Sequence, residues 1–144
     1  MANVRESIEV NAPIDDCYEA WRNFENFPRF MSHVKEVRVT GNQQHWVAEI
    51  MGMKKEWTAN LTTEDRPRAI AWQATGEVGM DGNVNFTQIE PRRTRVEVDF
   101  NWRGGGVVEG VGQALGIDNA SVKEDLTNFK KFVEGRKMAQ TPSR

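Results

Sequence analysis

Alternation of apolar and polar residues fills the middle of this 144-residue chain, between Val34 and Trp102. A period of two residues is typical of a strand that has one buried face and one face in water. The alternating segments are separated by short stretches that contain Gly or Pro, so neighbouring strands should pair antiparallel. The pattern therefore predicts a meander of about five or six strands. Its expected turns lie at residues 41–42, 51–53, 65–68, 80–82 and 90–93.

Before the meander, the pattern predicts one more strand and two short helices. Residues 4–10 alternate like a strand, and after Pro13 the apolar side chains recur at helical spacing as far as Phe24. Pro13 suits the first turn of a helix, because its missing N–H would have no partner there. Pro28 should end this helix or begin a second short one.

After the meander, helical periodicity returns. The three glycines at 104–106 should close the sheet, and two apolar stripes follow them. Together the stripes predict a C-terminal helix of about 30 residues, which would be about 45 Å long if it were unbroken. From Gly135 onward we expect the chain to fray. The stripes consist of Val107, Val108, Val111 and Leu115, and then of Val122, Leu126, Phe129 and Val133.

The simplest packing of these elements is an α+β fold, in which the sheet curls around the C-terminal helix and the two short helices plug one end. We expect a single domain over residues 1–137 and a flexible tail over residues 138–144. On the expected inner face, large rings alternate with alanines. These rings either pack solidly against the helix or enclose a mostly apolar cavity, and ligand-binding cavities are typically of this kind. The rings are Trp46, Trp57, Trp72, Phe86, Phe100 and Trp102, and the alanines are Ala48, Ala59 and Ala74.

Charge and cysteine content argue against several classes of function. The formal net charge is −2 and the basic residues are scattered, so the chain lacks the basic stripe that a nucleic-acid backbone requires. There is no apolar run of about 18 residues that could span a membrane, and no secretory signal, so the cytoplasm is the expected location. Cys17 is the only cysteine and there are two histidines, so we expect no metal and no cofactor.

Three segments of the chain resemble a known family. They are residues 21–31 (WRNFENFPRFM), the Ala71-Trp72 strand and residues 123–132 (KEDLTNFKKF). These landmarks and the order of elements resemble the polyketide cyclase/dehydrase and lipid transport family, which belongs to the START-like (Bet v 1-like, SRPBCC) superfamily with its helix-grip fold. The resemblance implies a hydrophobic cavity between the sheet and the C-terminal helix. Members of the family bind lipids, polyketides, quinones or hormones, and a minority catalyse ring closure or dehydration.

The resemblance and the aromatic inner face favour binding or transport of a hydrophobic small molecule, such as a lipid, quinone or polyketide-like compound, by a monomer or weak homodimer. Two alternatives stay open: a cyclase or dehydratase that works mainly by proximity, and a stress-related or interaction module whose cavity is filled by its own side chains. No catalytic residue is assigned, although loss of turnover on removing His33 or Lys55 would favour the enzyme. The expected ligand-binding residues are Phe27 and Phe30 at the cavity mouth, with Trp46, Trp57, Trp72, Phe86, Phe100, Trp102 and Leu115.

Overall fold

Hydrogen bonds join seven strands of the described chain into one antiparallel sheet, in the order β1-β7-β6-β5-β4-β3-β2. The structure is a computed structural model and describes residues 2–50, 52–76, 79–103 and 119–140. The helical elements are α1 (Ile14–Arg22), the short 3-10 helix η1 (Phe24–Arg29) and α3 (Asn119–Gln140). The strands are β1 (Ala2–Val10), β2 (Val34–Thr40), β3 (Gln43–Ile50), β4 (Met53–Asp65), β5 (Ala69–Ala74), β6 (Gly79–Glu90) and β7 (Arg93–Arg103).

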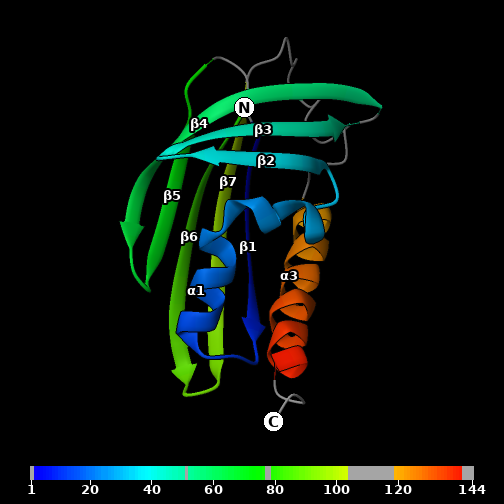
Figure 1. The fold of residues 1–144 in the computed structure, drawn as a ribbon. Helices are drawn as coiled ribbons and strands as arrows, with labels where there is room; N and C mark the ends of the chain where they lie inside the picture. Colours follow the sequence, from blue (N-terminus) through cyan, green and yellow to red (C-terminus); the bar gives the residue numbers. More distant parts are fainter. Residues whose placement is uncertain (1, 51, 77–78, 104–118, 141–144) are drawn as a thin grey trace.

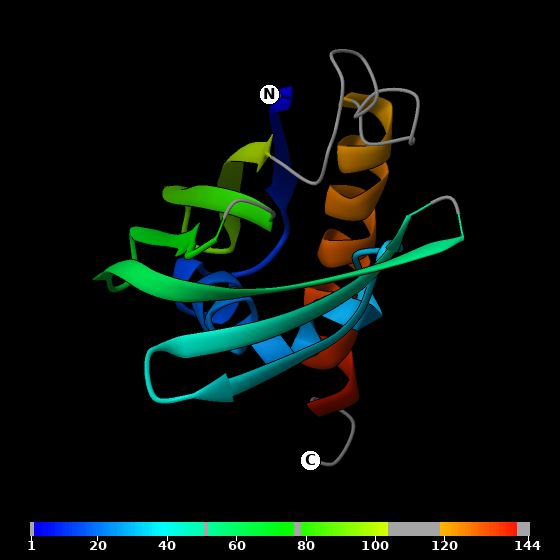
Figure 2. The same cartoon turned by 90° about the horizontal axis from the view of Figure 1, so that it is seen from above.

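The sheet is strongly curved, and the helices lie on its concave side (Figure 1). Strands β1, β5, β6 and β7 run along the long direction of the molecule, whereas β2, β3 and β4 cross them at one end. Figure 2 shows this end from above, with α1 and η1 beneath the crossing strands and α3 beside β1. Helix α3 packs against β1 and η1 packs against β2, so both edge strands of the sheet are covered. The predicted α+β helix-grip architecture is confirmed.

The strand register places the predicted rings on one face. Trp46 lies directly opposite Trp57 across β3 and β4, and Trp72 lies opposite Gly82 across β5 and β6. Trp102, near the end of β7, keeps part of its surface exposed. The other predicted inner-face residues are all buried, as expected from the alternation: Trp46, Ala48, Trp57, Ala59, Trp72, Ala74, Phe86 and Phe100.

One predicted turn is wrong. Residues 80–82 lie inside β6, which begins at Gly79. An Asp-Gly pair commonly marks a hairpin turn, but here Gly82 sits opposite Trp72 and leaves room for its ring. The glycine therefore serves close packing and not chain reversal. The turns predicted around residues 41, 52, 66 and 91 do join consecutive strands.

The C-terminal helix differs from the prediction at its end. Helix α3 has 22 residues and continues five residues beyond Gly135, so the expected fraying from that glycine is wrong. One glycine destabilises a helix by roughly 1 kcal/mol but does not end it where good helix formers follow, and residues 136–140 (RKMAQ) are such residues. The stripe predicted at 107–115, which includes Leu115, lies outside the described residues, as do the glycines at 104–106. The second predicted stripe is buried: Val122, Leu126, Phe129 and Val133.

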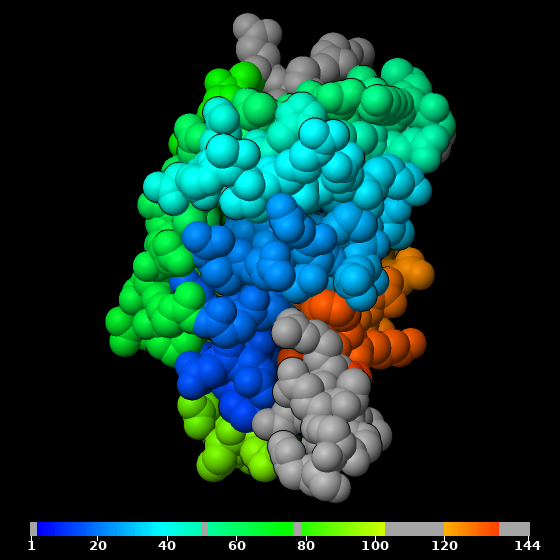
Figure 3. Space-filling model, viewed as in Figure 1, coloured from blue at the N-terminus to red at the C-terminus, as the bar shows by residue number. Residues whose placement is uncertain are grey.

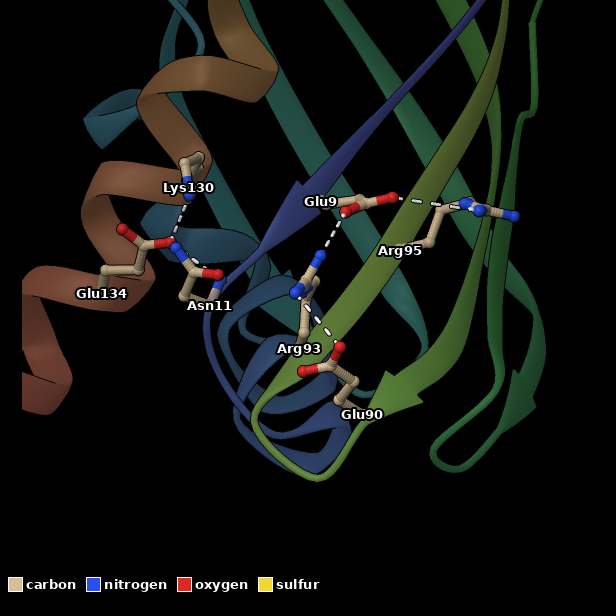
Figure 4. Close-up of polar contacts among 7 residues, drawn as sticks. All are labelled: Glu9, Asn11, Glu90, Arg93, Arg95, Lys130 and Glu134. Atoms are coloured by element: carbon tan, nitrogen blue, oxygen red, sulfur yellow. Dashed lines mark hydrogen bonds and ion pairs between the residues drawn. The ribbon is translucent and has the colours of Figure 1, made fainter.

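Polar contacts fix the C-terminal half of α3 to the rest of the fold (Figure 4). The Glu134 carboxylate accepts the backbone N–H of Asn11, between β1 and α1, at 2.8 Å and the ammonium group of Lys130 at 2.6 Å. On the sheet, Glu9 and Arg93 form an exposed ion pair at 3.3 Å. Exposed pairs contribute at most about 1 kcal/mol each. The Asn11–Glu134 hydrogen bond therefore helps to position the helix, and the exposed Glu9–Arg93 pair adds little to stability.

None of the helices in the described part of the chain is both long and apolar enough to cross a membrane.

Candidate functional site

Four indoles form a continuous row on the concave face of the sheet. The rings of Trp46 and Trp57 are stacked, with centroids 5.7 Å apart and 15° between their planes. Trp46 also stacks on Trp72, at 5.8 Å and 22°. Trp102 meets Trp57 edge to face at 5.7 Å. The row Trp72–Trp46–Trp57–Trp102 thus connects β5, β3, β4 and β7, and we call it the indole row.

Two glycines of β6 make room for this row. A Cβ atom at Gly82 would lie 2.1 Å from Cζ2 of Trp72, and a Cβ atom at Gly79 would lie 2.9 Å from Cδ1 of Trp57. Real side chains almost never approach so closely. Glycine at these positions lets the two indoles lie against the sheet backbone, which is a common reason for glycine inside a strand.

Aromatic side chains of η1 cover one half of the indole row. Phe24 meets Trp72 at 5.1 Å, and Phe27 meets Trp46 at 5.2 Å, both edge to face. Phe30, just after η1, packs against Phe129 of α3 at 5.0 Å. The exposed fractions of Phe27 and Phe30 are 0% and 2%, so neither lies at an open mouth on the surface. In the space-filling view, side chains of α1, η1 and β2 close over this side of the molecule (Figure 3).

Most of the predicted ligand-binding residues belong to one network of ring contacts. Phe100 of β7 joins it through Trp72, at a centroid distance of 6.0 Å. Phe86 lies apart, because its ring contact is with Tyr18 of α1 at 5.6 Å. Leu115 lies outside the described residues. The network contains Phe27, Phe30, Trp46, Trp57, Trp72, Phe100 and Trp102. Trp21 of α1, which was not among the predicted ligand-binding residues, also joins it.

Several hydrogen-bond donors are buried in the interior, and only some of them have a partner among the described residues. The Trp46 N–H donates to the side-chain oxygen of Gln44 at 2.9 Å, and the Thr94 hydroxyl donates to the carbonyl of Ala12 at 2.9 Å. Other donors are buried without a partner in the described part of the chain. They are the indole N–H groups of Trp21, Trp57, Trp72 and Trp102, together with the hydroxyl of Tyr18.

A buried carboxyl group lies beside the aromatic network. Asp125 of α3 is only 8% exposed, and its Oδ1 accepts the backbone N–H of Ser32 at 3.3 Å and the Ser32 hydroxyl at 3.5 Å. Burial raises the pKa of Asp125 from 3.8 to about 6, and the nearby charge of Glu124 acts in the same direction. The two bonds from Ser32 oppose this shift. A carboxyl group with this pKa exchanges protons near neutral pH.

Asp125 belongs to a polar contact between α3 and residues 30–33. One turn before it, the Ser121 hydroxyl lies 3.5 Å from Nε2 of His33. One turn after it, Asn128 donates to the carbonyl of Phe30 at 3.4 Å. This cluster was not predicted from the sequence, although a signal was present: Asp125 falls between Val122 and Phe129 on the apolar stripe, where a carboxylate is unexpected.

Other candidate acid, base or nucleophilic groups lie elsewhere. His45 pairs with Glu56 at 3.0 Å on the exposed side of the sheet. Cys17 is buried in α1, and burial raises the pKa of its thiol to about 12, so the thiol stays neutral and unreactive. Lys55 is half-buried in β4. Of these groups and His33, only His33 contacts the polar cluster around Asp125.

A groove lies on the opposite face of the sheet. This open groove of about 510 Å³ crosses β1, β6 and β7. Two of its charged groups already pair with one another, since Asp99 binds Arg5 at 2.9 Å, and Asp99 also accepts from Asn3 at 2.6 Å. The groove is therefore a weaker candidate than the aromatic interior. Its polar and charged lining comprises Arg5, Glu6, Ser7, Asn83, Asn85, Glu97 and Asp99.

Comparisons with known protein sequences agree with this architecture. The sequence pattern of the family described as "Polyketide cyclase / dehydrase and lipid transport" matches residues 10–131. An uncharacterized 17.2 kDa protein of Streptomyces lincolnensis is 37% identical over 138 residues, which cover 94% of this chain and 92% of that protein.

Solved structures show the same fold. A START superfamily protein from Mycobacterium smegmatis has a TM-score of 0.77 at 14% identity, over 92% of this chain and 97% of its own. The Zhui aromatase/cyclase from Streptomyces sp. R1128 has a TM-score of 0.74 at 20% identity, over 97% of this chain and 98% of its own. The family pattern spans most of the chain, and the Streptomyces lincolnensis protein aligns over nearly its full length. This chain therefore belongs to the polyketide cyclase/dehydrase and lipid transport family and has a START-like fold.

Proposed function

We propose that this protein binds an apolar small molecule, such as a lipid, quinone or polyketide-like compound, against the inner face of its sheet. The observation that carries the proposal is the indole row, in which four tryptophans from four strands lie in mutual contact on the concave side. Ligand sites are typically lined by aromatic and apolar side chains with a few polar groups. Binding of this kind requires no catalytic residue.

The end of the row at Trp57 and Trp102 is the proposed seat of the ligand. Phe24 and Phe27 already cover Trp46 and Trp72 at the other end. Trp102 keeps partial exposure, so a ligand can reach it from outside. A flat or flexible apolar molecule placed there would stack on indoles without displacing η1.

Replacing Trp102 with alanine should weaken ligand binding about tenfold, because a ring contact is worth roughly 0.5–1.5 kcal/mol beyond the apolar area that it buries. Isothermal titration calorimetry with a long-chain fatty acid, a quinone and an aromatic polyphenol measures this change. Ile89→Ala is the matched control, since Ile89 is an exposed apolar residue of β6. If none of the three ligand classes binds, or if both variants lose affinity equally, the proposal is wrong.

Catalysis of ring closure or dehydration is the second candidate, and Asp125 is the observation that favours it. General acid–base catalysis is most effective when the pKa of the group lies near the working pH, and the pKa of Asp125 is about 6. The Phe30–His33 segment that Asp125 contacts carries one ring of the aromatic network, Phe30. A chain folded against those rings would bring its reacting carbons close together.

A pH–rate profile tests this second candidate. With a linear poly-β-ketone thioester as substrate, turnover should follow an apparent pKa near 6, and Asp125→Asn should remove that dependence. His33→Gln tests the neighbouring imidazole, and Lys55→Met tests the half-buried amine of β4. A rate whose pH dependence is unchanged in Asp125→Asn would exclude Asp125 as the acid or base.

A further inference from the structure

Helix η1 covers part of the indole row and is followed by a short connection that contacts α3. Phe24 and Phe27 of η1 lie over Trp72 and Trp46, so a movement of η1 away from the sheet would expose both indoles. Residues 30–33, which follow η1, form no helix or strand and pass beside the N-terminal half of α3 (Figure 1). The attachment of these residues to α3 therefore helps to decide whether η1 stays in place.

Four polar contacts attach residues 30–33 to α3, and we call them the joint. All four are long for hydrogen bonds, between 3.3 and 3.5 Å. A hydroxyl that donates to a carboxylate usually lies about 2.5–2.7 Å away, so the joint compensates a charge on Asp125 poorly. The contacts join Ser32 to Asp125 twice, Phe30 to Asn128 and His33 to Ser121.

A negative charge on Asp125 disfavours the closed joint. The side chain is 8% exposed, and burial raises its pKa from 3.8 to about 6. With residues 30–33 moved away, water would reach the carboxyl group and its pKa would return toward 3.8. The closed joint thus binds the proton more tightly than the open joint does. A rise in pH therefore favours the open joint, and a fall in pH favours the closed one.

Three other charged or titratable groups lie near Asp125. The negative charge of Glu124, its neighbour in α3, raises the pKa of Asp125 further. Lys123 donates to the carbonyl of Ser7 in β1. His33 is the second titratable group of the joint, and its protonated form would favour a charge on Asp125 at acidic pH. The effect of His33 is therefore opposite in direction, and a variant can separate it from that of Asp125.

We propose that ionisation of Asp125 loosens the joint, so that η1 moves off the indole row more often at neutral pH than at mildly acidic pH. A 3-10 helix of six residues suits such a movement, because few backbone hydrogen bonds hold it. The movement would add Trp46 and Trp72 to the ligand seat at Trp57 and Trp102. This consequence rests on the function proposed above, whereas the movement itself requires no ligand.

Amide hydrogen exchange of the unmodified protein measures the movement, because exchange detects rare local openings. The reporters are the N–H groups of Phe30 and Met31, which both donate to the carbonyl of Phe27, and that of Val34, which donates to Met31. After correction for the base catalysis of exchange, the opening equilibrium constant of these amides should rise about tenfold between pH 5 and pH 7.

The dependence of exchange on urea separates a local movement from unfolding of the whole protein. Strand β7 has a neighbouring strand on each side, so its amides should exchange through global unfolding and respond strongly to urea. The amides of Phe30, Met31 and Val34 should respond only weakly, because opening of the joint exposes little surface.

Asp125→Asn should abolish the rise between pH 5 and pH 7, because asparagine keeps an acceptor oxygen for Ser32 and cannot ionise. Glu124→Gln is the matched control, since it removes a carboxylate from the neighbouring position of the same helix and should keep the rise. His33→Gln should keep the rise as well. Its loss in that variant would assign the effect to the imidazole and overturn the inference.

A flat pH profile, a rise that persists in Asp125→Asn, or a full response of the reporter amides to urea would each overturn the inference as well. None of these results would touch the proposed function, because no ligand is present in the measurement. If instead the fatty acid, the quinone and the polyphenol all fail to bind, the proposed function is wrong, and a confirmed movement of η1 would stand as a property of the fold.

Discussion

Replacing Gly82 with alanine should destabilise the protein by about 3 kcal/mol, a large effect for the addition of one methyl group. The new Cβ atom would lie 2.1, 2.4 and 2.5 Å from three carbons of the Trp72 indole. The Trp72 ring has little space to move away from the added methyl group, because it also contacts Trp21, Phe24 and Trp46. Urea unfolding followed by circular dichroism measures the change as a shift in the midpoint.

Gly76→Ala is the matched control. A Cβ atom at Gly76 would meet nothing within 4 Å, so this substitution should change the free energy of unfolding by no more than about 0.5 kcal/mol. A double variant isolates the cause: Trp72→Leu removes the ring that the added methyl group would strike, so the penalty for Gly82→Ala should shrink sharply in that background. An unchanged penalty would mean that contact with the indole is not the reason for glycine at position 82.

The sequence predicted the sheet well, because burial on one side imposes a period of two on each strand. Trp46, Trp57 and Trp72 were expected on the inner face and are buried there. The pattern could not predict how deeply those rings pack, since the periodicity of a strand carries no information about glycines on the neighbouring strand. Gly82 was therefore assigned to a turn, although its role is fixed by Trp72, ten residues earlier in the chain and directly opposite in register.

The candidate site was predicted in part for the same reason. Aromatic content and alternation identified the rings, but the pairing state of each indole N–H depends on tertiary contacts such as that of Trp46 with Gln44. Asp125 was not predicted, because its hydrogen-bond partner is the backbone N–H of Ser32, 93 residues away in the chain. A pattern of side chains carries no information about such a donor. Its place on the apolar stripe was visible in the sequence, and a buried carboxyl group with a raised pKa is a sign of a candidate functional site.

The second large effect concerns Asp125 itself, since the folded protein holds this carboxyl group in surroundings that disfavour its charge. Its pKa is 3.8 in an ordinary aqueous setting and about 6 in the fold, so the folded state binds the proton more tightly than the unfolded chain does. Stability should therefore rise as the pH falls from about 6 toward 4. Above pH 6 the full penalty applies, and a shift of this size corresponds to about 2–3 kcal/mol.

Asp125→Asn should accordingly stabilise the protein by about 2 kcal/mol at pH 8, and the gain should shrink toward zero at pH 4. Asparagine removes the buried charge and keeps a side-chain oxygen that can accept the Ser32 N–H. Glu124→Gln, which neutralises the adjacent exposed carboxylate, is the control and should change stability by at most about 0.5 kcal/mol at either pH. Urea unfolding midpoints of the unmodified protein and of both variants, measured at pH 4, 6 and 8, test these expectations.

A lower stability of Asp125→Asn at pH 8 would show that the carboxylate is a net stabilising group, in conflict with the raised pKa. A gain in stability would have a consequence for function. Substitutions that stabilise a protein are easy to find, and those at working sites often reduce activity. If the asparagine variant is more stable at pH 8 yet loses pH-dependent turnover, then the charge at Asp125 destabilises the fold and is retained for chemistry. If it is more stable and binds its apolar ligand as before, the carboxyl group has no part in ligand binding.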